Sequence, residues 1–186
     1  MKVKNIIRNA AEYLNLKNVI KFLEGEIDTS EEVERDLHNL IIAVNMVNNT
    51  VASSYIELVT ESDLDAKNDI IKFNEISSYS IIEIKKIVSG SGAHVPFKIL
   101  TEGIKLPKPG SYKIEFTYFP EKLDIDDNLD YYLKLNELTF AMGVASEFLY
   151  IRGDVDDGYM WDKRFKNSLY NLLRPKRNIV MPARRW

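Results

Sequence analysis

The chain offers few side chains whose type and spacing could perform chemistry. His38 and His94 are the two histidines of the sequence, and there is no cysteine. His38 falls on the solvent-facing side of a predicted helix, and one isolated histidine does not make a metal site. His94 follows Ser89-Gly-Ser-Gly-Ala, which resembles a phosphate-binding loop but lacks the Lys-Ser/Thr ending of a P-loop. We therefore expect a surface histidine at 38 and an ordinary hairpin turn before 94.

Two acidic clusters could offer oxygen atoms to calcium. They are Asp124, Asp126, Asp127 and Asn128, and Asp154, Asp156 and Asp157. Neither cluster has the spacing or the distal glutamate of a calcium loop, and carboxylates ahead of a helix are expected from the helix dipole. The sequence also contains no GxSxG, HExxH or dinucleotide-binding fingerprint. These patterns predict a protein that is not an enzyme and that needs no cofactor or metal.

The C-terminal segment is the least expected part of the sequence. Its five cations, with no carboxylate among them, are Arg174, Lys176, Arg177, Arg184 and Arg185. The whole chain has a net charge of −3, so the residues before this segment carry −8. Composition alone leaves open a disordered basic terminus. However, Ile179, Met181 and Trp186 are apolar or aromatic residues that disordered arms tend to lack. Arg, Met and Trp are also enriched at interfaces, which predicts a docking segment for an acidic surface with an apolar pocket.

Helical periodicity dominates the first third of the chain. It predicts a helix ending near Asn15, a short helix over 19–24, and a long helix from Thr29 to Tyr55. Thr29 and Glu32 could form a capping box at its start. The apolar face of the long helix is Val33, Leu37, Leu40, Val44, Val47 and Val51. The polar residues expected to face water are Glu34, Arg35, Asp36 and Asn39.

After the long helix, apolar residues no longer recur at helical spacing but at every second position, as in a β-strand. The polar residues from Glu61 to Asp69 predict a loop, and the alternating apolar residues between Ile70 and Tyr118 predict about four antiparallel strands in a meander. Turns are expected at 89–92 and 105–110, where glycine and proline gather.

Two further helices are predicted after an acidic linker over 121–130. The apolar face of the first is Leu135, Leu138, Met142, Ala145 and Leu149, and that of the second is Trp161, Phe165, Leu169 and Leu172. Gly153 should end the first helix and Asp154 begin the second. Both helices should pack on the long helix, and Pro175 should end the second.

The expected fold class is therefore α+β. Residues 1–58 and 128–173 would form a helical bundle around one long central helix, 59–127 an inserted antiparallel β-meander, and 174–186 an extended basic C-terminal arm. A chain of 186 residues with 45% hydrophobic and 28% charged residues can bury a core of this kind. Residues 1–16 lack the apolar core of a signal peptide, and no run reaches membrane-spanning length.

The order of these elements resembles the head-to-tail connector (adaptor) proteins of tailed bacteriophages. The segments that carry the resemblance are the Asn-rich stretch Val44-Asn-Met-Val-Asn-Asn-Thr50 of the long helix, the strand Tyr112-Lys-Ile-Glu-Phe-Thr-Tyr118, the two closing helices and the basic end. The resemblance implies a structural protein of the virion neck, made in the cytoplasm of the bacterial host. It would form a homo-oligomeric ring, typically a dodecamer, through which the genomic DNA passes without sequence-specific contact.

The same resemblance implies the partners. The β insertion would contact a tail or neck protein, and the C-terminal arm would dock on the portal protein. The implied docking residues are Arg174, Lys176, Arg177, Ile179, Met181, Arg184, Arg185 and Trp186. Two alternatives remain open at this point. One is a tail-completion or tail-terminator protein of the same virion, and the other is a nucleic-acid-binding protein that uses the basic arm on phosphates.

Overall fold

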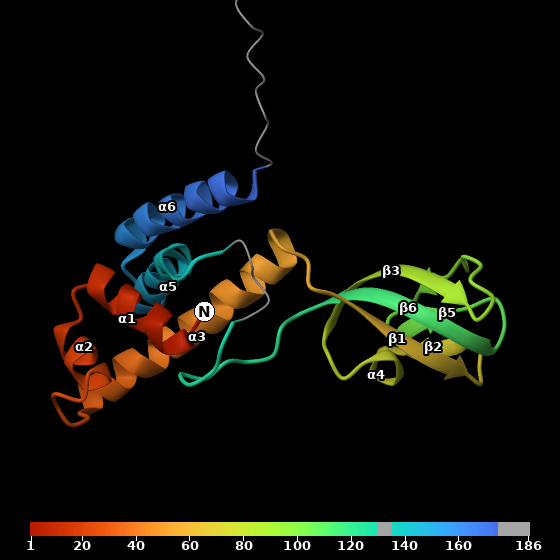
Figure 1. The fold of residues 1–186 in the computed structure, drawn as a ribbon, viewed down its shortest axis with the longest axis horizontal. Coiled ribbons are helices and arrows are strands. Elements are labelled where there is room, and N and C mark those ends of the chain that lie inside the picture. Colours follow the sequence, from red (N-terminus) through yellow and green to blue (C-terminus); the bar gives the residue numbers. More distant parts are fainter. Residues whose placement is uncertain (130–134, 175–186) are drawn as a thin grey trace, which may run out of the picture.

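The computed structural model describes residues 1–129 and 135–174. Within them the chain is a mixed α/β protein with six helices and two small antiparallel sheets. In Figure 1 the molecule is elongated, with α1, α2, α3, α5 and α6 at one end and the strands with the short helix α4 at the other. The elements are α1 (Val3–Tyr13), α2 (Lys17–Leu23), α3 (Glu31–Ser54), β1 (Val59–Ala66), β2 (Ile70–Lys72), α4 (Phe73–Ile76), β3 (Ile81–Ser89), β4 (Lys98–Ile99), β5 (Gly103–Lys105), β6 (Gly110–Tyr118), α5 (Glu137–Arg152) and α6 (Val155–Leu173).

The predicted long helix is confirmed as α3, and Leu40, Val44 and Val51 on its apolar face are fully buried. Its predicted cap is wrong. Ser30 is the N-cap residue, and its hydroxyl oxygen accepts from the backbone N–H of Val33 at 3.4 Å, whereas the Thr29 hydroxyl donates to the Glu34 carboxylate. Serine and threonine are both good caps, so the sequence allowed either start for the helix.

Asp36 of α3 was expected to face water, but only 6% of its surface is exposed. The reason is that α2 packs against the first half of α3 and widens the buried side of that helix. Asn15, Lys17 and Val19, from α2 and the turn before it, line the same pocket as Asp36. Amphipathic periodicity locates the centre of a buried stripe but not how far a neighbouring short helix extends it.

The centre of the helical part is α5 rather than α3. Phe140, Ala141, Val144 and Phe148 of α5 are buried, and this helix packs against α1, α3 and α6. The predicted packing of both closing helices on the long helix is therefore wrong for α6, which packs on α5 and makes no extensive contact with α3 among the described residues.

The predicted apolar faces of α5 and α6 are only partly correct. Leu138 of α5 is 55% exposed and Leu172 of α6 is 37% exposed, although both were expected in the core. Neighbours on several sides of α5 spread its buried side chains around the helix, so one stripe does not describe them. Gly153 ends α5 with φ +86°, the left-handed conformation of a helix C-cap, which confirms the predicted break between α5 and α6.

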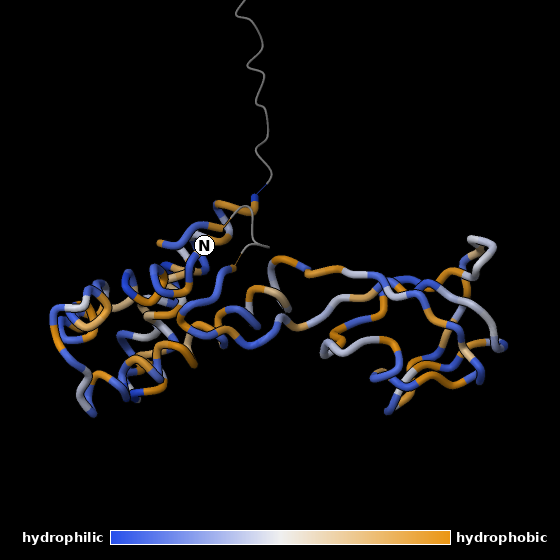
Figure 2. Tube along the Cα trace, turned by 60° about the horizontal axis from the view of Figure 1, so that its bottom comes forward, coloured by the Kyte–Doolittle hydropathy of each residue, from blue (hydrophilic) through white to orange (hydrophobic). Residues whose placement is uncertain are grey.

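The β part contains six strands in two sheets rather than a four-stranded meander. The strand orders are β1-β6-β3 and β2-β5-β4, and the two sheets share one core. Tyr112, Ile114 and Phe116 of β6 are buried in this core, as their alternation predicted. Figure 2 shows the hydrophobic segments of this part mixed with hydrophilic ones at the end of the molecule away from the helices.

The polar segment from Glu61 to Asp69, predicted as a loop, is mostly strand β1. It pairs antiparallel with β6 over its whole length, from Val59 opposite Thr117 to Ala66 opposite Gly110. Its polar side chains are poor strand formers, but an adjacent strand with a strong pattern supplies the hydrogen-bonding partner. Tertiary pairing therefore overrides local propensity here.

Strand β3 departs from simple alternation. Ile84 and Ile87 are both buried although they are three residues apart. The pairing of β3 with β6 shifts register between Ile81 and Glu83 and again between Ile84 and Lys86. Such bulges insert a residue and return the next apolar side chain to the core.

Candidate partner interface

Of the predicted docking residues, only Arg174 lies within the described part of the chain. It is the exposed C-cap residue of α6, its backbone N–H donates to the carbonyl of Tyr170 at 3.0 Å, and its guanidinium lies 5.8 Å from the centre of the Tyr170 ring. The other predicted residues lie outside the described residues. They are Lys176, Arg177, Ile179, Met181, Arg184, Arg185 and Trp186.

Helix α6 buries only a narrow strip of its surface, made of Gly158, Phe165 and Leu169. A second strip lies about a third of a turn around the helix from the first, and we call it the outer face of α6. It consists of Tyr159, Lys163, Lys166, Tyr170 and Arg174, all exposed and spaced by four, three, four and four residues. The two tyrosines are 59% and 63% exposed. Exposed tyrosine rings and arginine are residue types that are enriched where a protein surface contacts another molecule.

Sequence reasoning missed the outer face of α6 because the stronger apolar stripe through Phe165 and Leu169 identified only the packed side. The signal was nevertheless present. Tyr159, Lys163, Lys166 and Tyr170 recur at helical spacing about a third of a turn away from that stripe.

Ionisable groups gather where α5 meets α6. The Lys166 ammonium lies 2.7 Å from the Asp162 carboxylate, and this hydrogen bond raises the pKa of Lys166. Glu147 of α5 is half-buried nearby. Burial raises the pKa of its carboxyl, and the negative charge of Asp162 raises it further. The ion pair therefore stabilises the Lys166 cation, whereas burial and Asp162 disfavour the charged form of Glu147.

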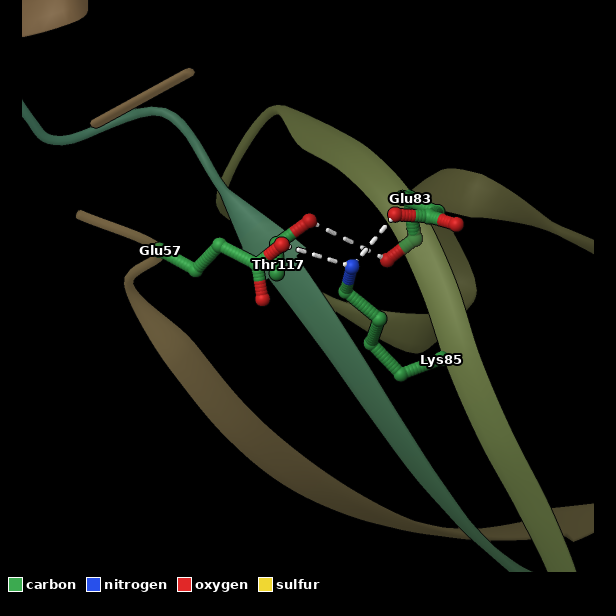
Figure 3. Close-up of polar contacts among 4 residues, drawn as sticks. All are labelled: Glu57, Glu83, Lys85 and Thr117. Carbon is green, nitrogen blue, oxygen red and sulfur yellow. Dashed lines mark hydrogen bonds and ion pairs between the residues drawn. The ribbon is translucent and has the colours of Figure 1, made fainter. Parts of the chain in front are cut away.

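A second polar cluster lies at the stem that joins the helical part to the β part. Figure 3 shows the Lys85 ammonium between two carboxylates, 2.9 Å from Glu57 and 2.6 Å from Glu83. Glu57 belongs to the link between α3 and β1, and Thr117 of β6 donates to the backbone carbonyl of Glu83 at 3.4 Å. The two hydrogen bonds raise the pKa of Lys85. The lysine therefore remains a cation that ties the stem to β3.

An aromatic contact reinforces the same stem. The rings of Tyr79 and Tyr118 lie 4.5 Å apart between centroids. Tyr118 also donates its backbone N–H to the carbonyl of Leu58, so the strand that enters the β part and the strand that leaves it meet at one place. Leu58 and Tyr118 both contact the core of the helical part.

Both histidines are exposed, and one of the two acidic clusters lies in a turn. His38 is exposed on α3, and His94 pairs with Val88 across the predicted hairpin turn, which is confirmed. The Asp127 carboxylate accepts from the backbone N–H of Asp124 at 2.7 Å and organises a turn. Within residues 1–129 and 135–174, no three His, Cys, Asp or Glu side chains are grouped as metal ligands.

An open pocket of about 490 Å³ lies at the end of the β1-β6-β3 sheet. Its polar lining includes Asp63, Asp65, Ser89, Ser111 and Lys113. The Ser111 hydroxyl donates to Asp65, and the Lys113 ammonium lies 3.0 Å from Glu61. These groups pair with one another. The residues that line the pocket include no histidine, which could act as the base that activates a serine.

No protein-family model matches the chain, and no curated protein matches it. The residues, contacts and charges of the chain itself are thus the basis for a functional proposal. None of the described helices combines the length and the hydropathy that crossing a lipid bilayer requires.

Proposed function

We propose that this protein is a head-to-tail connector of a tailed bacteriophage, a structural subunit of a ring between the portal and the tail. The observation that carries the proposal is the division of the chain into two parts with separate cores. A two-sheet β part is inserted between α3 and α5, and the Lys85 cluster ties the link between α3 and β1 to strand β3.

Two unlike parts give a subunit two unlike surfaces, which is what a protein between two different partners requires. In this proposal the helical part is a bundle that forms the wall of the ring, and the β part contacts a tail or neck protein. Copies meet through unlike patches, and a heterologous contact with the correct rotation closes into a ring, here of twelve subunits.

The C-terminal segment provides the second partner contact. Residues 174–186 act as an extended arm whose cations and apolar side chains, from Arg174 to Trp186, dock on the portal. The protein acts in the virion neck without catalysis, metal or cofactor, and the DNA passes through the ring without base-specific contacts.

The test is a deletion of residues 176–186, which leaves every described residue in place. The full chain and the truncated chain are mixed with the portal protein encoded by the same genome, and the complexes are weighed by mass photometry. We expect the full chain to add several copies to the portal and the truncated chain to add none, with equal melting temperatures for the two chains alone.

The proposal would be contradicted by an unchanged mass of the portal complex after truncation. It would also be contradicted if no complex formed even with the full chain. A second assay is a gel shift of duplex DNA at physiological salt. A shift that depends on residues 176–186 while no portal complex forms would favour the nucleic-acid alternative.

A further inference from the structure

The cationic surface of the protein begins within the folded part, on α6. Residues 163–174 contain Lys163, Arg164, Lys166 and Arg174 and no carboxylate, and all four cations are exposed. Three of them lie on the outer face of α6 together with Tyr159 and Tyr170. Because the tyrosines are well exposed, this face can bury apolar area as well as form ion pairs.

An oppositely charged surface lies at the start of α3. Residues 24–34 contain six carboxylates and no cation: Glu24, Glu26, Asp28, Glu31, Glu32 and Glu34. All six residues are exposed, and Ile27 among them is 37% exposed. Arg8 forms an ion pair with Glu24 at 3.3 Å, and within the described part of the chain no ion pair neutralises the other five. We call residues 24–34 the acidic segment.

The two surfaces cannot meet within one subunit. Helix α5 packs against both α3 and α6 and lies between them, while α3 and α6 make no extensive contact in the described residues. In Figure 1 the acidic segment lies at the end of the helical part beside α2, and α6 lies across the opposite side of that part. Any contact between them is therefore a contact between two copies of the chain.

We propose that the outer face of α6 of one copy docks on the acidic segment of a second copy. The contact is heterologous, because each copy presents one surface and uses the other, so every copy can engage two neighbours. The inference deepens the proposed ring by naming its two contacting surfaces, and in that sense it rests on the proposed function.

Charge decides for a second copy rather than a nucleic acid as the occupant of this face. Residues 163–186 carry eight cations and no carboxylate, so residues 1–162 carry a net charge of −11 when the whole chain carries −3. A nucleic acid offers only negative charge and is repelled by that acidic body, whereas a second copy offers a localised acidic segment to α6 and carries cations of its own.

A reciprocal charge swap tests the contact. One variant carries Lys163→Glu and Arg174→Glu, both on the outer face of α6, and the other carries Glu26→Lys and Asp28→Lys in the loop before α3. By sedimentation at low ionic strength, the natural protein should self-associate, and added salt should weaken this association. Each variant alone should associate about tenfold more weakly or worse, and an equimolar mixture should recover the association because each reversed surface finds its complement.

A matched control reverses two exposed carboxylates of the β part, Glu75→Lys and Glu102→Lys, and should associate like the natural protein. Equal melting temperatures of all variants would show that the fold is intact. A natural protein that stays monomeric at its highest soluble concentration, or a mixture that associates no better than its components, would overturn the inference. Loss of DNA binding in the α6 variant with unchanged self-association would overturn it as well.

The absence of cysteine from the sequence permits a second, independent measurement. Asn167→Cys on α6 and Thr29→Cys in the acidic segment are prepared separately and treated with a flexible bis-maleimide. A covalent dimer should form efficiently only in the mixture, and dimers from either variant alone would indicate a symmetric contact and contradict the proposal.

The two proposals fail differently. If portal complexes contain several copies but the charge-swapped variants assemble as well as the natural protein, the named surfaces are wrong and the connector function stands. If the swap behaves as expected but no portal complex forms, the self-contact stands and the connector function fails.

Discussion

Asn45 of α3 holds the backbone of Leu123 through both of its amide atoms. Its Nδ2 donates to the Leu123 carbonyl at 2.9 Å, and its Oδ1 accepts from the Leu123 N–H at 2.8 Å. The same Nδ2 also donates to the carbonyl of Ile41 at 2.9 Å. A residue from the asparagine-rich part of the long helix thereby fixes the segment that returns from the β part.

Replacing Asn45 by alanine should lower the free energy of unfolding by about 1 to 3 kcal/mol, because the partly buried N–H and C=O of Leu123 lose their partners. Urea denaturation measures this change. Asn49→Ala is the matched control on the exposed side of the same helix and should change stability by less than about 0.5 kcal/mol. Equal effects of the two substitutions would mean that water replaces the Asn45 hydrogen bonds at no cost.

A pair of leucine substitutions tests the location of the helical core. Leu40 of α3 is fully buried and Leu138 of α5 is 55% exposed. Leu40→Ala should cost about 2 to 5 kcal/mol through lost burial and the cavity left behind. Leu138→Ala should cost less than about 0.5 kcal/mol by the same denaturation measurement. A large loss at Leu138 in the isolated protein would show that α5 is packed differently.

Gly103 lets β5 approach β2 closely. A Cβ added at this residue would lie 1.9 Å from the carbonyl oxygen of Ile71, which is a backbone atom and has little freedom to move. Gly103→Ala should therefore destabilise the β2-β5-β4 sheet by about 1 to 3 kcal/mol or more. Faster amide exchange at Ile71 and Ile104 would report it.

The control for Gly103 is Gly90→Ala, where the nearest atoms to an added Cβ lie at 3.8 Å, an ordinary contact distance. Its exchange rates and melting temperature should stay close to those of the natural protein. If both substitutions are harmless, the two strands must be able to separate without loss of stability.

The half-buried Glu147 gives stability a dependence on pH. Its pKa is raised in the folded state, chiefly by burial, so folding favours the protonated carboxyl. This contribution is fully present below the pKa of the unfolded chain and is lost as the pH rises through the higher folded pKa. Glu147→Gln should raise the melting temperature at pH 7 relative to the natural protein, with a smaller difference at pH 4.

The control for this experiment is a second glutamate of α5 whose carboxylate is hydrogen-bonded rather than desolvated. At Glu147, Asp162 also raises the pKa, while the cation of Lys166 lowers it. Glu137→Gln, on the first turn of the same helix, should not raise the melting temperature, because the Glu137 carboxylate accepts from the backbone N–H of Lys2 and the side chain of Asn5. A lower melting temperature for Glu147→Gln at pH 7 would contradict the desolvation of Glu147.

Prediction from the sequence succeeded where one pattern dominates the environment of an element. The buried stripe of α3 and the alternation of β6 have a single packed side, so periodicity identifies them. It failed for β1, whose residues Glu61, Asp63 and Asp65 form a strand only because β6 offers hydrogen bonds to them. The exposure of Leu138 was missed for a related reason, since three neighbouring helices, which no local pattern reveals, decide what α5 buries.

The candidate interface was anticipated only at Arg174. A search for apolar stripes does not detect the outer face of α6, because two lysines lie between Tyr159 and Tyr170 on that face. Most of the predicted docking residues, from Lys176 to Trp186, lie outside the described residues, so their placement stays a prediction.

The insertion of the β part between α3 and α5 determines the order in which a growing chain can fold. The core of the β part draws on strands from Val59 to Tyr118, which are contiguous and complete before α5 is synthesised. The helical core cannot close until then, because α1 packs on α5 and the N-terminal backbone bonds to Leu129. On the ribosome, the β part should therefore acquire protease resistance first, while the apolar faces of α1 to α3 stay exposed until α5 has been synthesised.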